Sequence, residues 1–219
     1  MPHAHNALLR RRNLGLMLVV ALVFGTSAVA VGGTPQQRDS NAVYKYSGNV
    51  SDAVDPENAD NDVVKFDTND PNVADSMGRK VSETVSQVTD QVELKFFFVG
   101  RDCAAGSPRI DLFVDTNGDH KFDTLLNGYV GPSGSGCVQN KWQYLDLANL
   151  NDPTPRWGVN NGFPLQSWSS IVATFGNDDV VFGHLVDDSQ AFAPNNRGIA
   201  YYDLVSIGNR TFTSHEDGN

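Results

Sequence analysis

The segment from Ile110 to Val130 constrains the fold of this chain more than any other stretch. Residues 110–114 and 125–130 have the apolar patterning of β-strands. Between them lies a nine-residue loop, Asp115 to Asp123, which is rich in the Asn, Asp and Gly residues that form turns. The segment therefore predicts a β-hairpin that is closed by an acidic loop.

This loop carries oxygen ligands at regular spacing. Side chains of Asp115, Asn117, Asp119 and Asp123 occupy positions 1, 3, 5 and 9, and the main-chain carbonyl of Lys121 is available at position 7. Calcium takes six to eight hard oxygen ligands, and this spacing lets the oxygens converge as the backbone curls. We therefore predict that the loop binds Ca²⁺. The alternative is a hairpin built on Asx turns that holds no ion.

The loop is not an EF-hand, because His120 stands where an EF-hand has glycine and Leu126 where it has a bidentate glutamate. It resembles the D-x-N-x-D-x-x-x-D calcium loops of dockerins, thrombospondin-type repeats and many bacterial β-domains. Magnesium fits the pattern less well, since its strict octahedron tolerates an irregular loop poorly.

The N-terminus predicts export. Three arginines, Arg10 to Arg12, precede an apolar run from Leu14 to Phe24, and Ala28-Val29-Ala30 fits a signal-peptidase site. We expect residues 1–30 to be a signal peptide and residues 31–42 a linker. Retention of the apolar run as an anchor is the alternative, which would place the protein at the cell surface rather than in the medium.

Charge excludes some partner classes. The chain has 16 Lys and Arg against 26 Asp and Glu, and loss of the first thirty residues leaves a formal charge of −13. So acidic a protein is unsuited to binding nucleic acid or an anionic membrane, and no second apolar run predicts membrane insertion after cleavage.

Two cysteines, Cys103 and Cys137, flank the predicted hairpin on either side. In an exported protein the expected state is one disulfide, which would clamp the base of the hairpin. Two free thiols, or a catalytic cysteine, are the alternative.

The remaining sequence predicts an all-β protein, with about nine short strands in an antiparallel sandwich over residues 43–210. We expect an acidic loop over residues 49–62 and strands over residues 80–88 and 91–99. Val81, Val85, Val88 and Val92 also have helical spacing, so a helix is the alternative there. Residues 168–175 and 180–186 predict a hairpin, and residues 211–219 a flexible tail.

An acidic early segment, a sandwich and the closing strand A-Y-Y-D-L-V-S-I resemble the jelly-roll carbohydrate-binding modules. Such modules commonly hold a structural calcium between an early loop and an aspartate of the last strand. The resemblance implies a second, weaker metal site at Asp60, Asp62 and Asp203. An outward-facing Asp203 without an ion is the alternative.

The aromatic residues include candidates for sugar stacking, in which a flat ring meets the C–H face of a pyranose. Trp157, between Pro155 and Gly158, is the predicted ligand-binding residue, and Trp142 and Trp168 are expected in the core. No catalytic residue is assigned, because no nucleophile elbow or zinc spacing is present. We expect a non-catalytic exported module that binds a glycan or cell-surface polymer. A structural or adhesive protein and a small hydrolase are the alternatives.

Overall fold

The computed structural model describes residues 44–70, 73–103, 107–131, 137–188 and 197–212. The chain divides into two units, residues 1–36 and 37–219, and every described residue belongs to the second. The predicted signal peptide (1–30) and linker (31–42) lie outside the described residues. Within the described ranges, no helix is long and apolar enough to cross a membrane.

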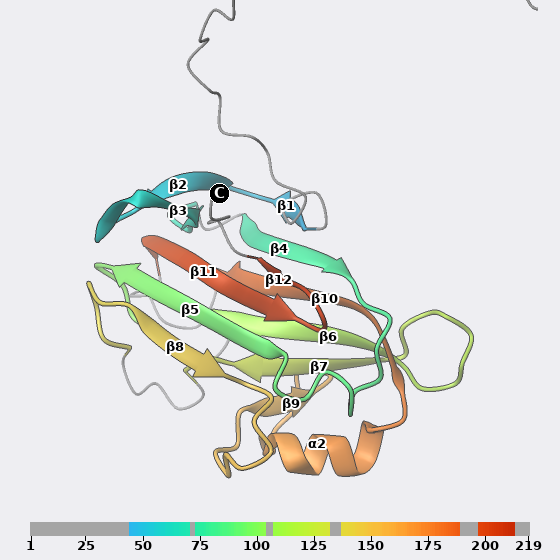
Figure 1. The fold of residues 1–219 in the computed structure, drawn as a ribbon. Coiled ribbons are helices and arrows are strands. Elements are labelled where there is room, and N and C mark those ends of the chain that lie inside the picture. The colour runs from blue at the N-terminus through green and yellow to red at the C-terminus, as the bar shows by residue number, and fades with distance from the viewer. Residues whose placement is uncertain (1–43, 71–72, 104–106, 132–136, 189–196, 213–219) are drawn as a thin grey trace, which may run out of the picture. The chain divides into compact units, whose positions relative to one another are not determined.

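Two antiparallel sheets form a sandwich, as predicted, although twelve strands are present in the described residues rather than nine (Figure 1). The first sheet contains, in spatial order, β1 (Lys45–Ser47), β4 (Ala74–Lys80), β10 (Asp179–Asp188), β6 (Arg109–Asp115), β7 (Thr124–Tyr129) and β9 (Trp157–Val159). The second contains β2 (Val50–Asp55), β3 (Asn58–Asp67), β11 (Ile199–Ile207), β5 (Val92–Val99) and β8 (Gln143–Asp146), with β12 (Thr211–Phe212) paired to β11. The chain crosses between the sheets repeatedly, as jelly rolls do.

Residues 49–62 are mostly strand, so the predicted acidic loop is wrong. β2 pairs with β3 from Val50 opposite Phe66 to Asp55 opposite Asn58. The apolar residues Val64 and Phe66 anchor the far end of β3 in the core. Main-chain pairing then extends the hairpin through residues whose side chains are too polar to suggest a strand.

Two further element predictions are wrong. Residues 81–91 form turns rather than a strand, although Val81, Val85 and Val88 do reach the core. The segment predicted as the first strand of a C-terminal hairpin is the helix α2 (Trp168–Phe175). Ser167 caps this helix by accepting a hydrogen bond from Ser170 N, and Trp168 and Ile171 are buried on one face.

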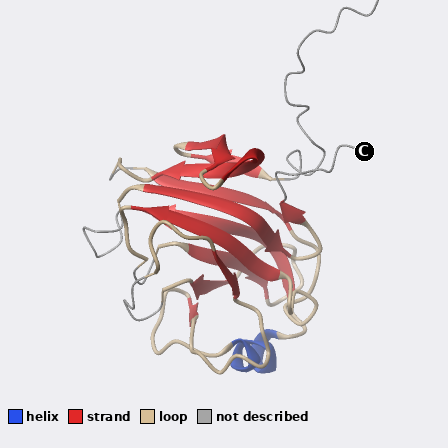
Figure 2. Ribbon diagram, turned by 60° about the vertical axis from the view of Figure 1, so that its left-hand side comes forward, coloured by secondary structure: helices blue, strands red, loops and turns tan. Residues whose placement is uncertain are grey.

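The hydrophobic core lies between the two layers of strands, and α2 lies at one end of them (Figure 2). Its members include Leu112 and Leu126 from the first sheet and Phe98 and Tyr202 from the second. Phe212 is also buried, in β12, so the sandwich extends past the predicted boundary at residue 210. Residues 213–219 of the predicted tail lie outside the described residues.

Candidate binding face

The predicted calcium loop joins β6 to β7 and is organised by hydrogen bonds to its own carboxylates. Asp115 accepts from the main-chain N–H groups of Asn117 (3.0 Å), Gly118 (2.7 Å) and His120 (2.6 Å). Burial favours a raised pKa for Asp115, but these bonds outweigh it and lower the pKa below its usual value. Asp115 is therefore an anion that shapes the loop.

The other predicted ligands also have partners within the loop. Asp123 accepts from Thr116 N and from Asn117 Nδ2, both at 3.0 Å. Asp119 accepts from Lys121 N and pairs with Lys121 Nζ at 3.1 Å. The donor chemistry suits calcium, but Asp119 and Asp123 would have to exchange these partners for an ion. Calcium binding at this loop therefore stays a prediction.

The second predicted metal site is not assembled. Asp203 pairs with Lys95 Nζ at 3.5 Å, while Asp60 and Asp62 are exposed on the β2–β3 hairpin. In the described part of the chain, no three His, Cys, Asp or Glu side chains are grouped so that they could hold an ion.

Trp157, the predicted sugar-stacking residue, has no exposed surface, so its assignment to a surface site is wrong. Its indole N–H donates to Leu147 O at 2.7 Å, and its ring lies 4.7 Å from that of Trp168. Gly128 on β7 makes room for the ring, because a Cβ there would lie 2.8 Å from Trp157. Trp157 is a core residue that joins β9 to β7 and α2.

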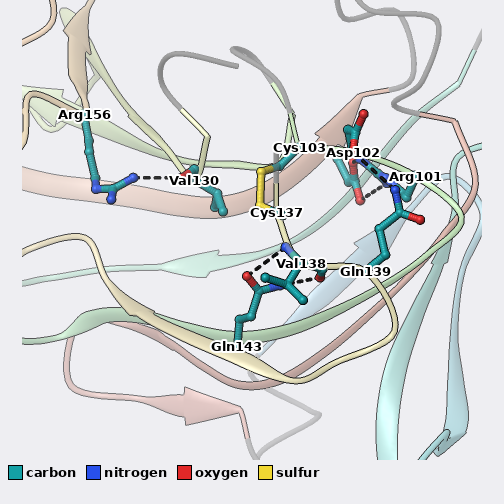
Figure 3. Close-up of a disulfide and its surroundings, with 10 residues drawn as sticks. Arg101, Asp102, Cys103, Val130, Cys137, Val138, Gln139, Gln143 and Arg156 are labelled. Atoms are coloured by element: carbon teal, nitrogen blue, oxygen red, sulfur yellow. Dashed lines mark hydrogen bonds and ion pairs between the residues drawn. A yellow bond between two sulfur atoms is a disulfide. The ribbon is translucent and has the colours of Figure 1, made fainter. Parts of the chain in front are cut away.

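The predicted disulfide between Cys103 and Cys137 is confirmed, with its Cα atoms 5.4 Å apart (Figure 3). Cys103 precedes β6 and Cys137 follows β7, so the bridge closes the base of the hairpin that carries the acidic loop. Cys103 is buried and packs against Gly131, where a Cβ would lie 2.8 Å from the sulfur. Next to the disulfide in sequence, the side-chain amide of Gln139 donates a hydrogen bond of 3.3 Å to the Asp102 carboxylate.

A different set of aromatic side chains lies on the outer side of the second sheet. Phe98 and Tyr202 point into the core, so their neighbours Phe97 and Tyr201 point outward. Phe97 lies 5.5 Å from Trp142 and 6.2 Å from Tyr201, measured between ring centroids. The three rings come from neighbouring strands of the second sheet: Trp142 directly precedes β8, Phe97 is in β5 and Tyr201 is in β11.

Tyr144 continues this row along β8 and is 57% exposed. It pairs with Lys95 of β5, which places it on the same side of the sheet as Phe97. Trp142 and Tyr201 are half-buried, and Phe97 is buried beneath them. We call Trp142, Phe97, Tyr201 and Tyr144 together the aromatic face.

The tip of the β2–β3 hairpin reaches the aromatic face. The indole N–H of Trp142 donates to Asp55 Oδ1 at 3.0 Å, although β2 and β8 occupy opposite edges of the sheet. The hairpin must therefore cross the outer side of the sheet to bring the two residues together. β3 pairs with β11 only from Val64 to Asp67, which leaves the rest of the hairpin free to do so.

Asp55 remains charged at this contact. Burial acts to raise its pKa, but hydrogen bonds from Asn61, Glu57 N and Trp142 lower it below the usual value. Lys95 lies 4.4 Å from the centre of the Trp142 ring, in cation–π geometry, and is 3.5 Å from Asp203. The aromatic face is thus bordered by charged groups that fix the Trp142 ring.

Sequence reasoning favoured Trp157 because it lies between Pro155 and Gly158, and it placed Trp142 in the core. Trp142 is instead half-exposed at the edge of the second sheet, whereas Trp168 is buried as expected. No family model, no curated protein and no solved structure matches this chain.

Proposed function

We propose that this protein is an exported, non-catalytic β-sandwich module that binds carbohydrate through the aromatic face. The observation that supports this function is the row of rings from Trp142 through Phe97 to Tyr201, which is extended by the exposed Tyr144. Trp142 and Tyr201 meet the buried Phe97 at interplanar angles of 59° and 71°, so the rings do not form one flat surface. The accessible parts of Tyr144, Trp142 and Tyr201 would each meet the C–H surface of a pyranose ring. Charged side chains at the border supply hydrogen bonds for hydroxyl groups.

Export agrees with the disulfide, since such bonds persist in oxidising compartments. The predicted Ca²⁺ ion belongs to the same proposal as a stabilising ligand of the Asp115–Asp123 loop. Asp115, Asn117, Asp119, Lys121 and Asp123 would hold it, and its contribution would be to the stability of the β6–β7 hairpin rather than to sugar contact.

Retention on a panel of insoluble polysaccharides tests the function. We expect Tyr144→Ala and Trp142→Ala to weaken retention by about tenfold or more, the loss of one well-packed contact of about 1.4 kcal/mol. Phe122→Ala is the matched control, because Phe122 is also 57% exposed but lies in the β6–β7 loop. Thermal melts of each variant separate loss of binding from loss of folding. The proposal fails if no polysaccharide is retained, or if Tyr144→Ala and Trp142→Ala both bind as the parent protein does.

A protein partner is the second candidate, and one observation favours it. On the outer side of the first sheet, Phe113 contacts the rings of Phe122, Phe182 and His184 at centroid distances of 5.2, 5.7 and 5.2 Å. Exposed apolar clusters of this kind occur at protein interfaces. Concentration-dependent self-association that is lost in Phe122→Ala, without polysaccharide retention, would favour this function.

A further inference from the structure

We propose that the carbohydrate recognised by the aromatic face is a polycation: an amino-sugar polymer with free amino groups. This inference rests on the proposed function and adds the charge of the ligand to it. Two observations support it: the distribution of carboxylates around the aromatic face, and the ion pairs that nearby lysines already form with other carboxylates.

The hairpin that reaches the aromatic face is strongly acidic. Residues 51–62 carry five carboxylates, and no lysine or arginine lies between Lys45 and Lys65. Most of these carboxylates are exposed, and Asp55 lies directly against the Trp142 indole. A ligand that stacks on Trp142 would therefore lie beside an unbalanced negative charge.

The lysines of this side offset that charge only in part: Lys95 lowers the pKa of Asp55, and the exposed Lys141 precedes Trp142, against five carboxylates in the hairpin. Lys95 is 3.5 Å from Asp203, and Lys65 is 3.6 Å from Asp67. Each ammonium group already has a carboxylate of its own, so these pairs leave the surplus of acidic groups unchanged.

A second acidic group lies at the exposed end of the aromatic face. Glu93 and Asp146 are directly opposite each other on β5 and β8, next to Tyr144. Like charges in this position destabilise a sheet, and an ammonium group placed between them would remove the repulsion. In agreement, burial and the nearby Glu93, Asp90 and Asp152 raise the pKa of Asp146 to about 6.

Charge complementarity therefore selects among sugars. Polyuronates and sulfated glycans would be repelled from this surface, and neutral polymers would gain nothing from its charge. A protonated amino sugar would combine ring stacking with attraction, including cation–π contact with the exposed ring of Tyr144. The attraction would be strongest at low ionic strength, because the groups concerned are mostly exposed.

Titration calorimetry with glucosamine oligomers and N-acetylglucosamine oligomers of equal length tests the inference. At low salt and pH 6.5, above the pKa of Asp146, we expect the free-amine oligomer to bind about tenfold more tightly, a difference that shrinks in high salt. Glu93→Gln with Asp146→Asn should reduce this preference. Asp178→Asn with Asp179→Asn, a matched double neutralisation at the start of β10 in the other sheet, should leave it unchanged.

The outcomes separate the two proposals. Equal or tighter binding of the acetylated oligomer, still sensitive to Tyr144→Ala, would overturn the polycation and leave carbohydrate binding intact. Binding of the free-amine oligomer that Tyr144→Ala and Trp142→Ala do not affect would show ion exchange alone, and would overturn both. Both proposals would also be overturned if neither oligomer bound and no polysaccharide of the panel were retained.

Discussion

Asp75 and Asp187 lie directly opposite each other on β4 and β10, both fully buried, and of the two only Asp187 forms an ion pair with a described residue. Arg101 donates to both oxygens of Asp187, at 2.7 and 2.8 Å, and Tyr202 Oη adds a bond of 2.7 Å. Asp75 accepts from Asn49 N, but its Oδ2 has no hydrogen-bond partner among the described residues. An ionised Asp75 is therefore poorly compensated.

The first prediction concerns the effect of pH on this pair. Burial raises the pKa of Asp75 from 3.8 to about 6. The negative charges of Asp187 and Asp67 also raise it, whereas the hydrogen bond from Asn49 N and the positive charge of Arg101 lower it. Because the folded protein binds this proton more tightly, the stabilisation is complete below pH 3.8 and is lost as the pH rises through 6. The loss is at most about 3 kcal/mol. Asp75→Asn should therefore raise the free energy of unfolding at pH 8 and have little effect at pH 4.

Urea unfolding at both pH values measures this difference. Asp60→Asn removes an exposed carboxylate of the hairpin and serves as the control for net charge. A stabilisation of Asp75→Asn that is equal at pH 4 and pH 8 would contradict the titration of Asp75.

The second prediction concerns Arg101. Its side chain is fully buried, so Arg101→Met would leave the Asp187 carboxylate uncompensated in the core. We expect a loss of about 3–5 kcal/mol in the free energy of unfolding. The double variant Arg101→Met with Asp187→Asn removes both charges and should recover part of the loss. Chemical denaturation of the two variants decides the matter, and equal destabilisation of both would show that packing rather than charge is responsible.

The third prediction concerns the disulfide. Cys103 and Cys137 are 34 residues apart in sequence, and closing that loop contributes about 3–4 kcal/mol through chain entropy. Cys103→Ser with Cys137→Ser should lower the urea midpoint accordingly. The parent protein under reducing conditions should behave like the variant. An unchanged midpoint would show that the β6–β7 hairpin needs no clamp.

The fourth prediction concerns calcium. At a free concentration one hundred times Kd, the ion would stabilise the fold by about 2.7 kcal/mol, so chelation should lower Tm. Asp119→Ala is the informative variant, because Asp119 is exposed and pairs only with Lys121 in the loop. Without an ion its loss costs little.

Asp115→Ala does not discriminate in the same way, since three main-chain N–H groups lose their acceptor whether or not calcium binds. Abolition of the chelator effect by Asp119→Ala would establish the site. A Tm that chelator leaves unchanged in the parent protein would show that the loop is an ion-free turn.

Local sequence determined the β6–β7 hairpin, the disulfide that flanks it and the all-β class. The alternation of Ile110, Leu112 and Val114 needs no distant partner to be recognised, and turn residues fix where the strand ends. A chain with two cysteines has only one possible intramolecular disulfide, between Cys103 and Cys137.

Tertiary contacts decided which tryptophan lies at the surface and which segments became strand or helix. Trp157 is buried because β9 adds to β7 over Gly128, and Trp142 is half-exposed because β8 lies at a sheet edge. Residues 168–175 contain β-branched Ile171 and Val172, whose local preference for strand is overridden by a capped helix that buries Trp168 against Trp157. The acidic β2–β3 hairpin is held as strand by main-chain hydrogen bonds, which cannot be predicted from the polarity of its side chains. Sequence patterns reveal which local conformation a residue prefers. The exposure of its side chain depends on which strand or ring from elsewhere in the chain packs against it.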